Sequence, residues 1–257
     1  MNAHYKIGVA LSGGGIKGLC HAGALKALEE YGIKPDIIAG VSAGAIVGAL
    51  YADGYSPNEI GEFFKNISFR QMTKIKVLDS GFFSIDEFEK FLSKKLKAKT
   101  FEKLSIPLKI VATDLDKGKS VTFTHGSLID KIIASSSMPI LFMPKIIAGT
   151  HYVDGGVFKN FPVSTIREDC DTIIGINASP MVTSEYKLNI KNIAMRSYHF
   201  MEKANILHDK EICDILIEPT DMGHFDTFSL DKSQEIFEVG YSSTKAIIEN
   251  NNILSRI

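Results

Sequence analysis

The chain has 257 residues, of which 45% are hydrophobic and 23% are charged, and its formal net charge at pH 7 is -1. A chain of this size can bury enough apolar surface for one large domain, so we expect a single domain over residues 1–257. The balanced charge argues against nucleic acid as a partner. A short lysine cluster at residues 94–99 is typical of a solvated helix face.

The first quarter of the chain predicts two strands, each followed by a helix. Residues 5–11 form an apolar stretch typical of a strand, and residues 21–31 carry apolar side chains at helical spacing. A short buried strand at residues 36–39 is followed by an apolar helix over residues 43–52. A glycine-rich loop, Gly13-Gly14-Gly15-Ile16-Lys17-Gly18, joins the first strand to the first helix.

The remaining elements continue the alternation. Residues 57–99 contain two helical patterns, and we expect this region to form a helical cap over the site. Further strands are predicted at residues 108–113, 120–124, 145–153 (with a turn at Gly149), 172–176 and 215–217, and further helices at residues 128–136, 191–208 and 232–249. This order predicts an α/β fold: a three-layer sandwich with a largely parallel central sheet.

Several features bear on location. Cys20, Cys170 and Cys213 are odd in number, far apart and without metal-ligand spacing, which favours a reducing compartment, and we expect a cytoplasmic protein. No basic segment followed by an apolar one is visible at the N-terminus, so no secretory signal is expected. The longest apolar stretch, residues 37–52, is interrupted by Ser42 and several glycines, which favours a strand, turn and helix over a membrane span.

A G-x-S-x-G pattern, Gly40-Val41-Ser42-Ala43-Gly44, falls between the second predicted strand and its helix. A serine on this sharp turn is the arrangement of a nucleophile elbow. Gly40 and Gly44 lack a Cβ where the chain doubles back, so Ser42 can hold a strained turn with its hydroxyl accessible. Taken alone, the pattern is equally compatible with a small residue in an ordinary turn.

The glycine-rich loop also matches the G-x-G-x-x-G pattern of dinucleotide-binding proteins. That fold needs an acidic residue at the end of the second strand, whereas this strand runs into Ser42 and has Asp36 at its beginning. We therefore expect the backbone N–H groups of Gly14 and Gly15 to face a developing oxyanion instead, with the N–H of Ala43 as a further donor.

Four motifs taken in order resemble the patatin-like phospholipases. They are the glycine-rich loop, the G-x-S-x-G pattern, Ser135-Ser136-Ser137-Met138-Pro139, and Asp154-Gly155-Gly156-Val157-Phe158-Lys159-Asn160-Phe161-Pro162, and the resemblance covers about residues 5–180. It implies a patatin-like fold and a lipid acyl hydrolase in which an aspartate acts directly on a serine, with no histidine between them.

Carried over by motif, Ser42 is the nucleophile, Asp154 the base, and Gly13, Gly14 and Gly15 frame the oxyanion hole. An aspartate with a reference pKa of ~3.9 is a weak base for an alcohol, so the oxyanion hole must carry much of the catalysis. Lys17 stands where the family often has arginine, which keeps the charge and loses the guanidinium fork. The supporting motif residues are Lys17, Gly18, Gly40, Gly44, Gly155 and Gly156.

Alternatives remain open at this level. A Ser-Asp-His triad would leave His199, His208 or His224 to complete it. The same fold could serve a non-catalytic lipid-binding or regulatory protein, or an acyltransferase. We expect no cofactor and no metal, because the chain has neither an H-E-x-x-H pair nor a cysteine-histidine cluster.

The expected partner is a lipid or acyl-ester substrate, with transient contact to a membrane surface implied by that substrate. Apolar residues at 138–144, together with Phe69, Met72, Phe82 and Phe83, could line an acyl channel or form ordinary core.

Overall fold

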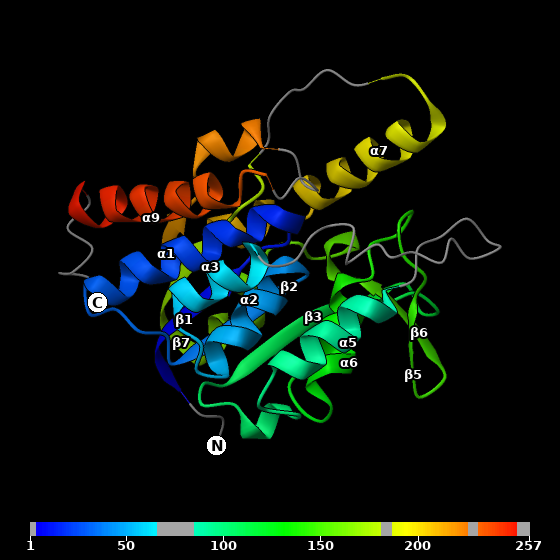
Figure 1. Ribbon diagram of the computed structural model, residues 1–257, viewed down its shortest axis with the longest axis horizontal. Helices are drawn as coiled ribbons and strands as arrows, with labels where there is room; N and C mark the ends of the chain where they lie inside the picture. Colours follow the sequence, from blue (N-terminus) through cyan, green and yellow to red (C-terminus); the bar gives the residue numbers. More distant parts are fainter. Residues whose placement is uncertain (1–3, 66–84, 181–186, 226–230, 251–257) are drawn as a thin grey trace.

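The computed structural model describes residues 4–65, 85–180, 187–225 and 231–250, and one eight-stranded sheet lies at its centre (Figure 1). The strand order is β5-β6-β3-β2-β1-β7-β8, with β4 also paired to β3. The parallel strands are β1 (Tyr5–Leu11), β2 (Ile37–Val41), β3 (Leu108–Asp114), β7 (Cys170–Ile176) and β8 (Ile215–Ile217). The antiparallel strands are β4 (Lys119–Phe123), β5 (Lys145–Ile147) and β6 (Thr150–Asp154). The predicted largely parallel sheet is confirmed.

Apolar side chains on both faces explain why the central strands are almost continuously hydrophobic. Along β1, Val9 and Leu11 belong to the main core, whereas Ala10 points to the opposite face and joins Ala39 of β2 in a smaller cluster. Successive side chains of a strand alternate between faces, so a sheet covered on both sides must be apolar at nearly every position.

The two layers that cover the sheet differ in construction. One side carries the helices α1 (Leu19–Glu30), α2 (Ala43–Ala52), α3 (Pro57–Lys65), α5 (Asp86–Lys95), α6 (Leu128–Ser136) and α9 (Ser233–Asn250). The smaller cluster on the other side contains Phe161, Val163 and Ile166, which lie in or next to the short turns η4 (Val163–Thr165) and η5 (Arg167–Asp169). It also contains Ile206, the residue before α8 (Leu207–Glu211). The sandwich is therefore asymmetric: in the described part of the chain, six helices form one layer, short turns and α8 form the other, and α7 (Ile190–Ala204) contacts the turn that follows β6.

The helix predicted over residues 191–208 is wrong in one respect, because the structure divides it into α7 (Ile190–Ala204) and α8. Asn205 lies at the break. Its side-chain nitrogen donates to the carbonyl oxygens of Gly156 at 2.8 Å and Val157 at 3.3 Å, and its side-chain oxygen accepts from the N–H of Asn160 at 2.8 Å. Tertiary hydrogen bonds of this residue therefore occupy the place where the sequence pattern alone continues as helix.

The strand predicted over residues 145–153 is a hairpin of β5 and β6. Ala148 has φ 50° and Gly149 has φ 81°, two positive values in succession. Such a pair is typical of the two-residue turns that match the twist of a hairpin. The predicted turn at Gly149 is thus present, and it brings Asp154 to the end of β6.

The ends of region 57–99 pack onto the main body. Ile60 and Phe64 of α3 and Phe88 and Leu92 of α5 are buried in the main core. The residues between them that were expected to line an acyl channel, Phe69, Met72, Phe82 and Phe83, lie outside the described residues. The cap stays a prediction. No described helix is long and apolar enough to cross a membrane.

Candidate active site

Ser42 lies at the sharp turn from β2 into α2, with φ 52° and ψ -119°. A positive φ at a residue other than glycine is strained and is favoured only where the surroundings enforce it. A Cβ at Gly40 would lie 2.5 Å from the carbonyl oxygen of Gly44, and one at Gly44 would lie 2.3 Å from that of Leu11. Both positions exclude any side chain, so the two glycines allow the close packing that forces the turn on Ser42.

A second serine, Ser135, anchors the backbone of the elbow. The N–H of Ser42 donates to Oγ of Ser135 at 2.8 Å, and that hydroxyl donates in turn to the carbonyl oxygen of Val111 at 2.6 Å. Ser135 lies in α6 and Val111 in β3, and Ser135 is fully buried. The elbow is therefore anchored to a neighbouring strand and helix through one hydroxyl group.

Asp154 ends β6, two strands from β2 in the sheet. A Cβ at the next residue, Gly155, would lie 2.5 Å from both the carbonyl oxygen of Val111 and Cγ2 of Val41, so the chain after Asp154 packs directly against the strand that leads to Ser42. The Asp154 side chain is fully buried, and its Oδ1 accepts from the N–H of Gly156 at 2.8 Å. Sheet topology thus brings together two residues 112 positions apart.

The pKa of Asp154 is raised to about 7. Burial is the largest cause, and the nearby carboxylate of Glu202 adds to it. The hydroxyls of Ser42 and Tyr198 and the N–H of Gly156 act in the opposite direction. Oδ2 of Asp154 forms no hydrogen bond of good geometry with a described residue, so the two hydroxyls influence it by proximity. A carboxylate whose pKa lies near neutrality is better matched to proton transfer than an ordinary aspartate.

Helix α7 contributes two buried residues that the sequence motifs do not indicate, Tyr198 and Glu202. They lie one helical turn apart, with exposed fractions of 2% and 6%. A Cβ at Gly156 would lie 2.8 Å from Oε1 of Glu202 and 3.0 Å from the hydroxyl of Tyr198, so both side chains reach the turn that follows Asp154. Burial and the charges of Asp154 and Glu202 raise the pKa of Tyr198 well above its usual range, which keeps this hydroxyl protonated.

The only sequence signal for this pair is a tyrosine and a glutamate at i and i+4 on a predicted helix. That spacing places the two side chains on one helix face without saying what the face contacts. Glu202 is also paired on its outer side, since its Oε2 lies 2.8 Å from Nδ1 of His199.

The glycine-rich loop is fixed next to the elbow. His21 Nε2 donates to the carbonyl oxygen of Ser12 at 2.8 Å, and the N–H of Gly13 donates to that of Asn160 at 3.0 Å. A Cβ at Gly13 would lie 3.4 Å from Cβ of Ser42, and one at Gly18 would lie 2.5 Å from Cβ of Ala43. The loop therefore borders the elbow directly.

The candidate oxyanion donors divide into two groups. Gly13 already uses its N–H in the bond to Asn160, so it shapes the loop without offering a donor. For the N–H groups of Gly14, Gly15 and Ala43, no acceptor is found among the residues that the structure describes. Gly15 has φ 60° and begins the turn η1 (Gly15–Gly18), which contains Lys17 and leads into α1. Of the candidate donors, these three N–H groups are therefore available to bind an anionic oxygen.

The histidines do not supply a third member of a triad. His21 is fully buried, and burial lowers its pKa to about 4, so it is neutral and serves the loop. His199 contacts Glu202, while His208 and His224 are exposed. The groups that influence the Asp154 carboxyl are Glu202, Ser42, Gly156 and Tyr198, with no histidine among them. This arrangement favours the Ser-Asp pair over the triad.

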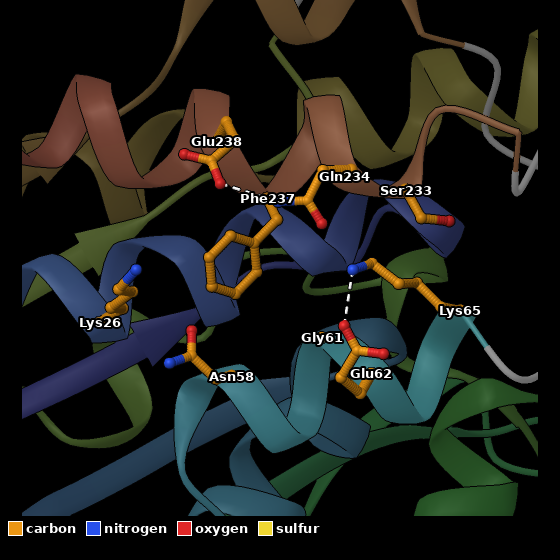
Figure 2. A pocket seen from close by; sticks show the side chains of 9 residues that line it. All are labelled: Lys26, Asn58, Gly61, Glu62, Lys65, Ser233, Gln234, Phe237 and Glu238. Carbon is orange, nitrogen blue, oxygen red and sulfur yellow. Dashed lines mark hydrogen bonds and ion pairs between the residues drawn. The ribbon is translucent and has the colours of Figure 1, made fainter.

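A pocket of about 200 Å³ lies elsewhere, between α1, α3 and α9 (Figure 2). Phe237 lies in its middle, Lys65 pairs with Glu62 at 2.6 Å, and Lys26 lies over the ring of Phe237 at 5.9 Å. Gln234 donates to Glu238 at 2.8 Å. None of the residues at the Ser42 elbow or on the inner side of α7 lines this pocket.

The fold and the site define an α/β protein with a strained serine at a strand-to-helix turn and a buried aspartate on a neighbouring part of the same sheet. A family model described as patatin-like phospholipase matches residues 9–166, more than half of the chain. The chain belongs to the patatin-like phospholipase family.

Similar sequences agree with this assignment. The uncharacterized protein YqhO of Bacillus subtilis is 32% identical over 215 residues, covering 70% of this chain and 74% of YqhO. An uncharacterized NTE family protein of Mycobacterium bovis is 31% identical over 198 residues, covering 70% of this chain and 54% of that protein. Patatin-like phospholipase domain-containing protein 7 of Rattus norvegicus is 29% identical over 273 residues, covering 91% of this chain and 20% of that protein. The chain thus matches about half or less of the length of two of these relatives.

Two solved structures are similar in fold. VipD from Legionella pneumophila has a TM-score of 0.55 at 15% sequence identity, covering 96% of this chain and 67% of VipD. The type III effector protein ExoU has a TM-score of 0.52 at 14% identity, covering 97% of this chain and 54% of ExoU. At such low identity the likeness concerns the fold alone.

Proposed function

We propose that the protein is a serine hydrolase that cleaves fatty-acyl carboxylic esters, with Ser42 as nucleophile and Asp154 as base. The observation that carries this proposal is the juxtaposition of a strained, anchored serine with a fully buried aspartate whose pKa is raised to about 7. Family membership supports a lipid substrate. The cytoplasmic location expected from the three cysteines stays a prediction.

In the proposed mechanism, Oγ of Ser42 attacks the ester carbonyl while its proton moves to Asp154. The N–H groups of Gly14, Gly15 and Ala43 stabilise the oxyanion of the tetrahedral intermediate. The intermediate collapses, the alcohol leaves with the proton from Asp154, and an acyl group remains on Ser42. Water then attacks the acyl-enzyme and gives a proton to Asp154. When the second tetrahedral intermediate collapses, that proton passes to Oγ of Ser42 and the fatty acid is released. Each of the two half-reactions therefore ends with Asp154 ionised again.

The acyl chain would lie along a small apolar cluster beside the proposed base. Met138 and Leu141 are buried there with Tyr198, and Ile140, Phe142, Val157 and Met195 pack against them. This cluster is separate from the two larger cores of the sheet. Its contact with Tyr198 places apolar side chains next to Asp154, as an acyl-ester substrate requires. Four of these residues belong to the segment 138–144, which the sequence predicts as part of an acyl channel.

The proposal is tested by fatty-acid release from p-nitrophenyl esters and lysophospholipids of graded chain length. We expect the wild-type protein to hydrolyse a subset of them and Ser42→Ala to lose that activity. Ser136→Ala is the matched control, because the buried Ser136 hydroxyl has no hydrogen-bond partner among the residues that the structure describes. Equal release by wild type and Ser42→Ala would refute the assignment. Product formation only when an alcohol acceptor is added would identify an acyltransferase instead.

A further inference from the structure

The outer face of α7 is apolar. Ile190, Ile193, Phe200 and Met201 have exposed fractions of 88%, 44%, 52% and 45%, and Ser197 between them is exposed as well. The steps from 190 to 193, 197 and 200 are three, four and three residues, and Met201 lies four residues after Ser197, which places all five in one stripe about 17 Å long. We call this set of five residues the α7 outer face.

This arrangement reverses the usual one for a surface helix. A helix on a globular protein normally turns its apolar stripe toward the core and its polar residues toward solvent. Helix α7 instead turns Glu202 and the hydroxyl of Tyr198 inward, and it turns two isoleucines and a phenylalanine outward. Single exposed apolar residues are common, whereas a continuous exposed stripe is typical of a binding surface.

The charges on α7 favour an anionic surface as the partner. Lys191, Arg196 and Lys203 are its cationic residues, and Arg196 lies over the ring of Phe200 at 5.1 Å. The single acidic residue in the helix, Glu202, is buried on the opposite side and paired with His199. Lys191 is exposed at the N-terminal end of α7, and Arg196 and Lys203 are half-buried beside the apolar stripe, so the helix carries positive charge next to its exposed apolar side chains. This combination binds membranes that contain anionic lipids.

The position of α7 links this face to the proposed site. Figure 1 shows α7 at the rim of the molecule, with its N-terminal half extending beyond the sheet. The inner side of the same helix contacts the turn after Asp154 through Tyr198 and Glu202. One helix diameter, about 10 Å, therefore separates a surface applied to the outer face from the groups around Asp154. A lipid would have a short path from that surface to the site.

We propose that the α7 outer face docks the protein onto the surface of a lipid bilayer that contains anionic lipids. The apolar side chains enter the boundary between headgroups and acyl chains, and the cationic residues contact the headgroups. The inference rests on the proposed function in that docking presents the lipid ester to Ser42. It concerns binding, however, and can be measured without turnover.

Binding is measured by flotation of the Ser42→Ala protein with vesicles of phosphatidylcholine, alone or mixed with phosphatidylglycerol. We expect binding to the mixed vesicles, weaker binding to pure phosphatidylcholine, and a decrease at high salt. Ile193→Glu combined with Phe200→Glu is expected to weaken the binding roughly tenfold or more, because two apolar side chains that enter the bilayer in the docked protein are lost. Ile146→Glu is the matched control, since Ile146 is 59% exposed on β5 and lies outside α7.

The same α7 and β5 substitutions are then made with Ser42 intact. All variants should hydrolyse a short soluble ester such as p-nitrophenyl butyrate at the wild-type rate, and only the α7 double variant should lose activity on vesicles. If the wild-type protein does not hydrolyse the soluble ester, the proposed function is rejected, while the vesicle-binding result remains valid. A double variant with serine in place of both residues, checked by thermal unfolding, controls for an effect of the introduced charge on folding.

Two results would overturn the inference. Vesicle binding by the α7 double variant equal to that of its Ser42→Ala parent would show that this face does not contact lipid. A concentration-dependent dimer in sedimentation velocity without vesicles, abolished by the α7 variant while vesicle binding persists, would assign the face to a second copy of the chain.

Discussion

The pKa of the Asp154 carboxyl is set by the surroundings that the fold gives it. Burial and the neighbouring Glu202 raise its pKa to about 7, and three hydrogen-bond donors around it prevent a still larger rise. A base in an α/β hydrolase triad is usually a histidine with a pKa near ~6.5. In this protein, burial and the Glu202 carboxylate bring the pKa of an aspartate into the same range.

The first prediction concerns the pH dependence of turnover. Asp154 must be ionised to accept the Ser42 proton, so kcat/KM for a soluble ester should fall as the pH falls through about 7. Glu202→Gln removes a negative charge that raises the Asp154 pKa, and the acid limb should therefore move to lower pH. Glu235→Gln on the exposed side of α9 is the control. An unchanged midpoint, or one at higher pH, would contradict the role of Glu202.

A second prediction follows from linkage between protonation and folding. Folding raises the pKa of Asp154 from 3.8 to about 7, so its protonated form is favoured in the native state. This contribution to stability is complete below the unfolded pKa and is lost as the pH rises through the folded one. Asp154→Asn does not titrate. Its Tm relative to wild type should increase between about pH 4 and about pH 8 in scanning calorimetry. A Tm difference that is equal at both pH values would argue against a buried, titrating Asp154.

The third prediction tests the serine beneath the elbow. Ser135→Ala leaves the N–H of Ser42 and the carbonyl of Val111 without their partner, and each unsatisfied buried group costs about 1–3 kcal/mol. We expect a lower free energy of unfolding in urea and a lower kcat. Ser136→Ala, next to it in the chain, should stay within about 0.5 kcal/mol of wild type, because the Ser136 hydroxyl makes no hydrogen bond within the described part of the chain. Similar decreases in stability and kcat in the two variants would show that the hydrogen bonds of Ser135 do not account for the effect.

Among the elements, the turn after β6 depends on α7 and α8. Asn205, between these helices, holds the carbonyls of Gly156 and Val157 and the N–H of Asn160. These bonds fix the chain segment that begins at Asp154. A residue remote from the reacting atoms can therefore control the orientation of the proposed base.

The fourth prediction uses that contact. Asn205→Ala should lower kcat on a soluble ester by about tenfold to a hundredfold with little change in KM, because small displacements of a catalytic group are costly. Asn192→Ala removes an exposed side-chain bond to the carbonyl of Lys187 within the same helix region and should have no effect on kcat. Wild-type kcat in Asn205→Ala would remove Asn205 from the positioning of Asp154.

Element prediction from the sequence succeeded where apolar periodicity was strong. The helix predicted over residues 128–136 agrees with α6, and the central strands appear near their expected positions. The break at Asn205 could not be predicted, because the local pattern continues as helix and only distant carbonyl groups explain the interruption. The short turns of the second layer were missed for a similar reason, since elements of three residues carry no period.

At the scale of the whole molecule, the sheet order brings the motifs together. Ser42 follows β2, Asp154 ends β6, and β3 lies between these two strands. The motif sequences predicted Ser42 and Asp154 as a pair. They did not indicate Tyr198 or Glu202, whose approach to Gly156 depends on how α7 packs across the end of the sheet. Pairwise packing of this kind is not encoded in local spacing.

The same helix that completes the site on its inner side presents the α7 outer face to solvent. One element therefore connects the environment of the proposed base with a surface suited to anionic lipid. In the proposed function, α7 would contact the lipid surface on one side and the groups around Asp154 on the other. The central claim of that function is that Ser42 forms a covalent acyl intermediate.

The fifth prediction and most direct measurement is therefore the mass of the protein after rapid acid quench during turnover of p-nitrophenyl butyrate. We expect a butyryl group on the peptide that contains Ser42 in the wild-type protein and no modification of that peptide in Ser42→Ala, which should also be inactive. Acylation of a different residue, or continued hydrolysis by Ser42→Ala, would contradict the proposed mechanism.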